Sequence, residues 1–419
     1  MKVDLLPLDK KIQRIVTAIR HSADKNKLQV YLVGGIVRDL LLKRKNFDLD
    51  IVVEGDALTF AKSMAVLMKA RLVTYGQFKT ATLMLSDGFQ FDLVTARQES
   101  YSFSGALPVV EPGSLKQDLF RRDFTINAMA ISIHKNSYGQ LVDYYGGCDD
   151  LKKGIIRILY DKSFIEDPTR ILRAVRFEQR FDFSMESKTL SLLKDALKKD
   201  VVGNVKAPRY FEEFKKVLKE KEPQKSLKRL RDLKALAFLS PKIQWNIQNY
   251  KSIKKIHRWA DDHLPENIHR EPWLIYFMEV LRGVSAKNRV MICQRFQLSR
   301  KDSLKVLQSS LKDKIVKNLS AKNILPHEIY GILKPVNQEA LLWILSSVSS
   351  KKILKHIENY LLKYAAIELK ISGHDLKSLG INPGTKMGWI MKKLLEKKID
   401  GQICTYHDEV KLAEQFACS

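Results

Sequence analysis

The feature that most constrains the fold is a change in periodicity near residue 165. Residues 1–150 alternate helical segments with short apolar or alternating runs, such as QVYLV at 29–33, that are typical of strands. Beyond residue 165 the strand pattern disappears, and helical segments separated by prolines follow one another. This change predicts an α+β fold: a small head with a mixed sheet and helices, followed by an extended all-helical neck, body and tail.

The same pattern gives the expected boundaries of domains and elements. We expect a head at 1–150, a neck at 151–220, a body at 221–350 and a tail at 351–419. Within the head we expect strands at 29–33, 47–53, 71–75, 80–85 and 89–95, helices at 11–21, 36–43, 57–69 and 124–133, and a loop at 98–113. Further helices are predicted at 168–181, 187–198, 207–218 and 223–233.

Positive charge is concentrated after the head. The 419 residues include 73 Lys and Arg and 47 Asp and Glu, which gives a net charge of +26. Residues 1–150 hold 20 of the basic and 17 of the acidic residues, so +23 of the excess lies in residues 151–419. Such an excess favours a polyanionic partner, because each neutralised phosphate releases counterions. A lysine-rich solvated surface would give the same balance.

Cysteine spacing and hydropathy exclude other classes. The cysteines at 148, 293, 404 and 418 form no CxxC pair and predict no zinc or redox motif. The longest apolar runs, such as 340–345, are far shorter than the about 20 residues that a membrane span needs. The first residues also lack the apolar stretch of a signal peptide. We therefore expect a cytoplasmic protein without membrane contact.

Two glycines separate a predicted strand from a predicted helix in the segment VGGIVRD at 33–39. Gly34 and Gly35 would leave backbone N–H groups and the positive end of the helix open to a phosphate. Arg38, in the first helical turn, could hold a triphosphate or sugar oxygen. A pair of glycines before a helix is common, so this segment alone does not define a nucleotide site.

Two acidic residues share one face of the strand predicted at 47–53. Side chains alternate along a strand, so Asp48 and Asp50 point the same way, opposite to Leu49 and Ile51. Adjacent carboxylates repel unless a cation lies between them, and Mg²⁺ binds through one or two carboxylates plus phosphates. Asp92, on another predicted strand, could be a third ligand. A surface pair of aspartates remains the alternative.

Together these features resemble the polymerase-β-like nucleotidyltransferase head, which here reads GGIVRDLLL followed by NFDLDIVV. Further motifs narrow the resemblance: RRDFTINAM at 121–129, DYYGG at 143–147 and EDPTRILRAVRF at 166–177. They occur in the order and spacing of class II tRNA nucleotidyltransferases (CCA-adding enzymes) and bacterial poly(A) polymerases. The resemblance implies that the nucleotide is held by Gly34, Gly35, Arg38, Arg121, Asp123, Asn127, Asp167, Arg170, Arg173 and Arg176, and that Asp48 and Asp50 bind Mg²⁺.

The chemistry of Asp167 and Arg170 can also be argued from the residues. If both lie on one helix, three residues apart, they are neighbours on one face. Aspartate only accepts hydrogen bonds and arginine only donates them. Cytosine and adenine each present an amino donor beside a ring-nitrogen acceptor, so this pair suits both bases. Uracil and guanine present the reverse order, which leaves a polar group unsatisfied at a cost of about 1–3 kcal/mol. A solvated salt bridge is the alternative.

Two further segments refine the predicted activity. The loop at 98–113 resembles the family's flexible loop at full length, which argues against an enzyme that adds only C. ISGHDLKSLGINPG at 371–384 resembles a tail element of tRNA nucleotidyltransferases. The resemblance therefore implies addition of CMP and AMP from CTP and ATP to the 3′ end of tRNA, with the body and tail binding the acceptor arm. A-addition alone, poly(A) synthesis and an inert RNA-binding protein are the alternatives, and the oligomeric state is left open.

Overall fold

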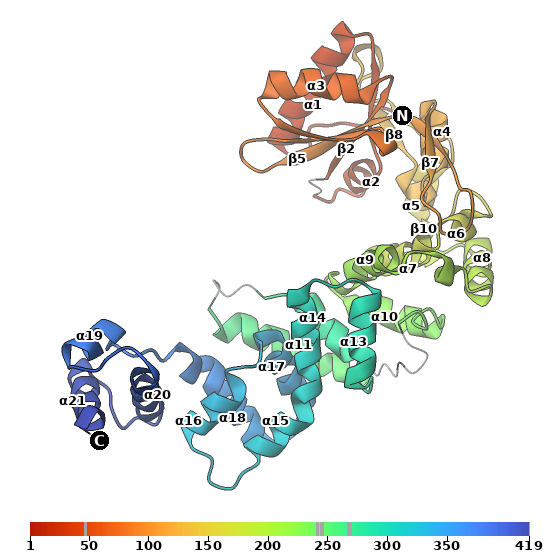
Figure 1. The fold of residues 1–419 in the computed structure, drawn as a ribbon. Coiled ribbons are helices and arrows are strands. Elements are labelled where there is room, and N and C mark those ends of the chain that lie inside the picture. Colours follow the sequence, from red (N-terminus) through yellow and green to blue (C-terminus); the bar gives the residue numbers. More distant parts are fainter. Residues whose placement is uncertain (46–47, 240–242, 244–246, 266–269, 419) are drawn as a thin grey trace. The chain divides into compact units, whose positions relative to one another are not determined.

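A computed structural model describes residues 1–418 except 46–47, 240–242, 244–246 and 266–269. The chain divides into two compact units, residues 1–238 and 239–419. Figure 1 labels many of the elements of both units. The first unit combines a mixed sheet with helices and the second is helical in its described part, which confirms the predicted fold class. The finer division into head, neck, body and tail stays a prediction.

A seven-stranded sheet forms the core of the first unit, in the order β3-β4-β5-β2-β1-β8-β9. Strands β2 and β5 pair in parallel and the other neighbours are antiparallel. The bounds are β1 (Gln29–Val33), β2 (Leu49–Glu54), β3 (Arg71–Tyr75), β4 (Thr80–Met84), β5 (Gln90–Thr95), β8 (Ala130–Ser132) and β9 (Leu141–Val142). The predicted head strands are thereby confirmed to within a few residues, although Phe47 lies outside the described residues.

Helices of the first unit cover the sheet and then continue beyond it. Helices α1 and α3 pack on one face of the sheet, as Figure 1 shows. The first unit contains α1 (Lys10–Lys25), α2 (Gly35–Leu41), α3 (Ala57–Met68), α4 (Leu115–Phe120), α5 (Gly147–Lys153), α6 (Ser163–Glu166), α7 (Thr169–Phe181), α8 (Ser187–Lys198), α9 (Ala207–Leu218) and α10 (Pro223–Asp232). Helix α7 buries Ile171, Leu172 and Val175 and contacts both α9 and α10, so its other face is left for polar groups.

The helix predicted at 124–133 is wrong. A short 3₁₀ turn, η2 (Thr125–Asn127), precedes β8, and β8 pairs antiparallel with β1. Residues 128–131 are fully buried. Periodicity cannot distinguish a buried strand from a buried helical segment in so short an apolar run. Strand β1 offers an edge for pairing, and this contact between distant segments decides that the residues form β8.

The loop predicted at 98–113 is only partly correct. Strands β6 (Arg97–Ser100) and β7 (Val109–Pro112) pair as a separate two-stranded ribbon. Gly105 and Pro108 lie in the true loop between them, at 101–108. The prediction of an all-helical neck also needs a small correction, because β10 (Ile155–Ile156) and β11 (Ser184–Met185) form a short parallel pair.

The second unit packs its helices around large apolar side chains. Trp273, Phe277 and Trp343 are buried where α11, α12 and α17 meet. Its helices are α11 (Ile247–His263), α12 (Pro272–Val280), α13 (Ala286–Arg295), α14 (Arg300–Gln308), α15 (Lys312–Leu319), α16 (Pro326–Leu333), α17 (Gln338–Ser347), α18 (Lys351–Leu362), α19 (Gly373–Ser378), α20 (Thr385–Ile399) and α21 (Tyr406–Cys418). Across the described part of the chain, every helix is too short or too polar to pass through a bilayer.

Candidate functional site

The predicted site residues meet in one cleft of the first unit. Its volume is about 880 Å³, and the sheet, the β6–β7 loop, α7 and α9 all contribute to its lining. The lining includes all the predicted residues: Gly34, Gly35, Arg38, Asp48, Asp50, Asp92, Arg121, Asp123, Asn127, Asp167, Arg170, Arg173 and Arg176. Segments separated by more than 100 residues in the sequence therefore converge on one polar site.

Three carboxylates lie on the sheet side of this cleft. Asp50 in β2 and Asp92 in β5 are direct partners in the parallel register, and Asp48 precedes β2. Burial raises the pKa of Asp50; the charge of Arg122 lowers it, and the charges of Asp92 and Asp48 raise it further. Asp92 accepts a hydrogen bond of 2.6 Å from the hydroxyl of Thr82. These acids are thus gathered at an electrostatic cost that a cation would relieve.

The carboxylates on the sheet fit a magnesium ion that takes the rest of its ligands from a substrate. Among the residues with described positions, no three His, Cys, Asp or Glu side chains are arranged to hold an ion by themselves. Mg²⁺ needs only one or two carboxylates, because water and phosphate oxygens complete its coordination. Asp50 and its neighbours could therefore bind a divalent ion once a nucleoside triphosphate supplies the remaining oxygens.

Gly34 is required by both its backbone and its surroundings. Its φ of +72° lies in the left-handed region, which favours glycine. A Cβ at this position would lie 2.9 Å from Nη1 of Arg122 and 3.8 Å from Oδ2 of Asp50. Arg122 is a residue that the sequence reasoning did not assign to the site. The motif at 121–129 contains two adjacent arginines, and no local pattern shows which of them faces the carboxylates.

Arg38 belongs to a buried polar network rather than to an open surface. Its guanidinium donates to Asp39 at 2.9 and 3.0 Å and to Oδ1 of Asn127 at 2.6 Å. The ring of Phe181 lies 4.7 Å from this guanidinium. Asn127 in turn donates to Asp123 at 2.9 Å. The network fixes the cleft wall at the start of α2.

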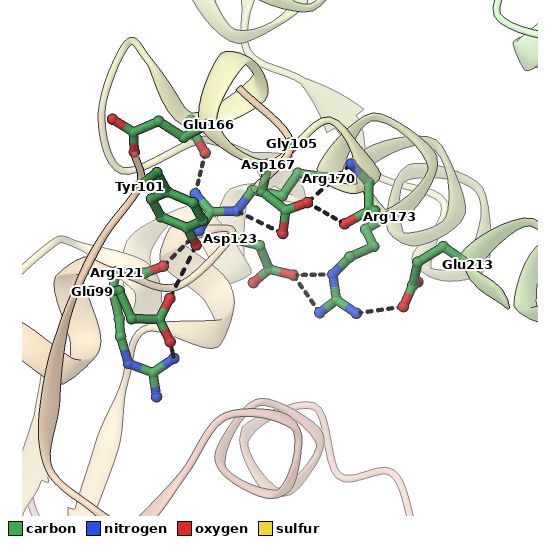
Figure 2. A network of polar contacts seen from close by, with 12 residues as sticks. Glu99, Tyr101, Gly105, Arg121, Asp123, Glu166, Asp167, Arg170, Arg173 and Glu213 are labelled. Atoms are coloured by element: carbon green, nitrogen blue, oxygen red, sulfur yellow. Dashed lines mark hydrogen bonds and ion pairs between the residues drawn. The ribbon is translucent and has the colours of Figure 1, made fainter. Parts of the chain in front are cut away.

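Asp123 connects this network to α7. Its Oδ2 accepts a hydrogen bond of 2.8 Å from Nε of Arg173. Burial alone would raise the pKa of Asp123, but the charge of Arg173 and the hydrogen bond from Asn127 outweigh it and lower the pKa to about 2. Figure 2 shows Arg173 between Asp123 and Glu213, and its second ion pair, with Glu213, measures 3.6 Å. Glu213, on α9, is a further residue that the sequence reasoning missed.

Asp167 and Arg170 come together, although not as two residues of one helix. Helix α7 begins at Thr169, so Asp167 lies in the connection between α6 and α7, with its Oδ2 4.0 Å from Nε of Arg170. Nη1 of Arg170 donates to Tyr160 at 3.1 Å and to Ser163 at 2.6 Å. Asp167 accepts hydrogen bonds from the amide and the hydroxyl of Thr169, so both side chains of the pair are oriented by several contacts.

Arg121 is held by carboxylates within the cleft. Its guanidinium donates to Asp118 at 2.7 Å and to Glu99 at 2.9 Å. Burial favours the neutral form, yet the charges of Asp118 and Glu99 raise its pKa overall. Its carbonyl oxygen accepts a hydrogen bond of 2.7 Å from Nη2 of Arg170. Arg121 thus supports Arg170 through its backbone, a contact that the motif did not predict.

Arg209 links Asp167 to the β6–β7 loop. Nη2 of Arg209 lies 3.0 Å from Oδ1 of Asp167, while Nη1 donates to the carbonyls of Gly105 at 3.3 Å and Ala106 at 3.2 Å. The amide of Gly105 also donates to the carbonyl of Glu166 at 3.1 Å. The sequence reasoning missed Arg209 because it predicted only a helix at 207–218.

Arg176, on α7, also lines the cleft. Its Nη1 donates to Glu220 at 3.3 Å, whereas its buried Nε has no hydrogen-bond partner among the residues that the structure describes. Burial, and then the charge of Arg173, lower its pKa, although Glu213 and Glu220 act in the other direction. An N–H group without a partner can donate a hydrogen bond to an anionic ligand at little cost, because no existing hydrogen bond has to break.

Comparisons with known proteins show which family the chain is similar to. The Poly A polymerase head domain matches residues 30–157, and the Probable RNA and SrmB- binding site of polymerase A matches residues 182–246. An A-adding tRNA nucleotidyltransferase of Halalkalibacterium halodurans is 32% identical over 96% of this chain and 92% of its own length. Another, of Geobacter sulfurreducens, is 34% identical over 94% of this chain, which spans only 46% of that protein.

A solved structure extends the likeness to the fold. The Thermotoga maritima CCA-adding enzyme complexed with tRNA has a TM-score of 0.74 and 32% identity, and the alignment covers 99% of this chain and 97% of that one. The chain therefore belongs to the family of class II tRNA nucleotidyltransferases and bacterial poly(A) polymerases.

Proposed function

We propose that this chain adds CMP and AMP, from CTP and ATP, to the 3′ end of tRNA without a template. The observation that carries this proposal is the single cleft that combines the carboxylates of β2 and β5 with the Asp167–Arg170 pair. The carboxylates suit phosphoryl chemistry, and the pair suits recognition of a base. An enzyme that extends tRNA in this way would act in the cytoplasm.

Selection of the base would depend on the fixed order of acceptor and donor. Asp167 would accept from the amino group of cytosine or adenine, while Arg170 would donate to the neighbouring ring nitrogen. Thr169 and Arg209 orient Asp167, and Tyr160, Ser163 and the carbonyl of Arg121 orient Arg170. Such support would keep the pair from turning to suit uracil or guanine.

The chemical step would take place at the sheet. Asp48 and Asp50 would hold Mg²⁺ and Asp92 would orient towards the same place; the ion would supply charge neutralisation for the attacking hydroxyl and the leaving pyrophosphate. Arg122, whose guanidinium lies beside Gly34, would approach the triphosphate there. The arginines of α7 would contribute a preorganised positive field that costs no rearrangement during reaction.

A-addition alone is a second candidate. Both curated relatives described above are named A-adding tRNA nucleotidyltransferases, whereas the Thermotoga maritima structure is of a CCA-adding enzyme. All the groups proposed to choose between bases serve cytosine and adenine equally. The two candidates therefore differ in whether CMP is accepted first.

Three tRNA transcripts that end before the CCA, after the first C and after CC would separate the candidates. Purified protein is incubated with each transcript and with ATP or CTP singly or together, and product lengths are read on a denaturing gel. Incorporation of C, C and A supports CCA addition, and incorporation of A only on the CC transcript supports A-addition. Long A tracts, or no incorporation with any transcript, would overturn the proposal.

A further inference from the structure

A second groove opens beside the cleft in the first unit. It has a volume of about 570 Å³ and shares Arg176, Arg180 and Lys216 with the cleft, so the two adjoin. Arg44, Lys219 and Lys221 complete its basic lining, against the two acids Glu220 and Glu222. We call this feature the side groove.

The acids of the side groove leave part of its positive charge uncompensated. Glu220 pairs with Arg176 at 3.3 Å and with Arg180 at 3.7 Å, and Glu222 pairs with Lys225 at 2.9 Å. Arg44, Lys219 and Lys221 are exposed, and the ion pairs of Glu220 and Glu222 are made with other basic residues. Several basic side chains that line one groove together raise the positive potential within it.

Two of the basic residues are held in place by an aromatic ring. The guanidiniums of Arg44 and Arg180 lie 5.0 and 5.5 Å from the ring of Phe181, at the end of α7. Arg180 follows Arg176 by four residues and Arg173 by seven, so these arginines form one stripe along α7. The stripe leads from the cleft into the side groove.

We propose that the side groove binds the sugar-phosphate backbone of the RNA strand just upstream of its reactive 3′ end. This inference rests on the proposed function, because a 3′ hydroxyl at the carboxylates requires the rest of the strand to leave the cleft. In the proposed function the nucleoside triphosphate occupies the cleft, so the phosphates of the RNA strand are the anions left for the side groove. In sequence-independent binding of a single strand, a positively charged groove follows the sugar-phosphate backbone.

A triple variant tests the groove without touching the cleft. Arg44→Ala, Lys219→Ala and Lys221→Ala remove three exposed charges, none of which lines the cleft. The matched control removes Lys194, Lys198 and Lys199, which are exposed at the end of α8 and line neither cavity. Thermal unfolding midpoints show that both variants fold. A second variant, Lys219→Arg with Lys221→Arg, keeps the charge and should retain the wild-type behaviour.

Fluorescence anisotropy with a labelled tRNA ending in CC, over a series of salt concentrations, gives the binding result. We expect the slope of log affinity against log salt to become shallower by about 2 in the groove variant, since each lost phosphate contact contributes about 0.7 for a single strand. KM for ATP should stay unchanged while KM for tRNA rises.

Two outcomes would overturn the proposal. Equal slopes for the groove variant and the α8 control would make the groove an ordinary solvated surface. An increased KM for ATP with unchanged tRNA binding would assign the groove to the triphosphate instead. Because anisotropy needs no catalysis, a wild-type protein that binds tRNA with this salt dependence but transfers no nucleotide would overturn the proposed function and leave the groove assignment standing.

Discussion

On the sheet side of the cleft, Asp50 and Asp92 lie on neighbouring strands, and the pKa of Asp50 is raised by burial and by the nearby acids. On the helical side, Arg170 and Arg173 are each held by several acceptors, and opposite charges raise the pKa of Arg173 even though burial acts against it. One wall thus gathers like charges, whereas the other pairs opposite ones.

This difference indicates which parts of the site are complete before substrate arrives. Paired arginines are fixed in advance, so they can read a base or stabilise charge without rearrangement. Clustered carboxylates remain costly until a cation joins them, and a nucleotide brings that cation with its phosphates. We therefore expect substitutions on the sheet wall to affect rate, and substitutions on the helical wall to affect stability or selection.

The largest effect is expected on the sheet wall. Asp50→Asn keeps the shape of the side chain and removes its charge, so nucleotide transfer should fall by about 10³-fold, the scale seen when one transition-state group is lost. The measurement is single-turnover incorporation of AMP on a tRNA ending in CC. Asp149→Asn, at a position that is 72% exposed, provides the matched control. Transfer by the Asp50 variant at full speed would remove the basis of the proposed mechanism.

Asp123→Asn should chiefly lower stability. The change leaves Arg173 without its main buried partner, at a cost of about 3 kcal/mol in the free energy of unfolding. The folded-state pKa of Asp123 is lowered from 3.8 to about 2, so the stabilisation is present above pH 4. About 2 kcal/mol of it is lost as pH falls from about 4 to about 2.

Urea denaturation of the wild type and of Asp123→Asn between pH 7 and pH 2 checks this. The difference in unfolding free energy should shrink only in the acidic window, because asparagine does not titrate. A difference that is constant with pH would mean that packing, rather than the charge of Asp123, stabilises the wall.

Arg209 should affect selection, because it contacts both Asp167 and the loop carbonyls of Gly105 and Ala106. Arg209→Gln should raise KM for ATP about tenfold, the effect of one lost charged hydrogen bond of about 1.5 kcal/mol. Arg209→Lys should keep a charge near Asp167 but lose the planar fork that also reaches the loop.

Ser104→Ala separates the two roles of Arg209. It removes the 2.6 Å hydrogen bond from Ser104 to the carbonyl of Ile165 and so loosens the same loop without touching Asp167. Initial rates with ATP and CTP are compared for all variants. If Ser104→Ala reproduces the Arg209→Gln effect, attachment of the loop controls selection; if Arg209→Gln changes neither KM, Arg209 is not a positioning residue.

The contrast between the walls also explains what the sequence could predict. The period of a strand placed Asp48 and Asp50 on one face, and the buried Leu49 and Ile51 confirm the opposite face. Arg122, Arg209 and Glu213 were missed, because their positions depend on how α9 and the 121–129 segment pack against α7. Local periodicity contains no information about such contacts between distant segments.

The predicted strands and helices also divide into those that local periodicity identifies and those that distant contacts determine. Predicted strands with alternating or apolar runs are present, whereas the segment at 124–133 is a turn and a strand because β1 offers an edge for pairing. Asp167 lies before α7 rather than in it, since the helix begins at Thr169 after Pro168. The contact between Asp167 and Arg170 was nevertheless predicted correctly. A residue just before the first turn of a helix still lies beside the residue three positions later.

The smallest effect tests whether Asp92 belongs to the reactive part of the sheet wall. Thr82→Val keeps the shape of the side chain but removes the hydroxyl that donates to Asp92 at 2.6 Å. If Asp92 helps to hold the cation, loss of this orientation should slow transfer about fivefold, since the net contribution of one hydrogen bond is about 0.5–1.5 kcal/mol. Asp92→Asn should then slow it far more. Equal, unchanged rates for both variants would leave Asp48 and Asp50 as the only acids of the wall that act on the nucleotide.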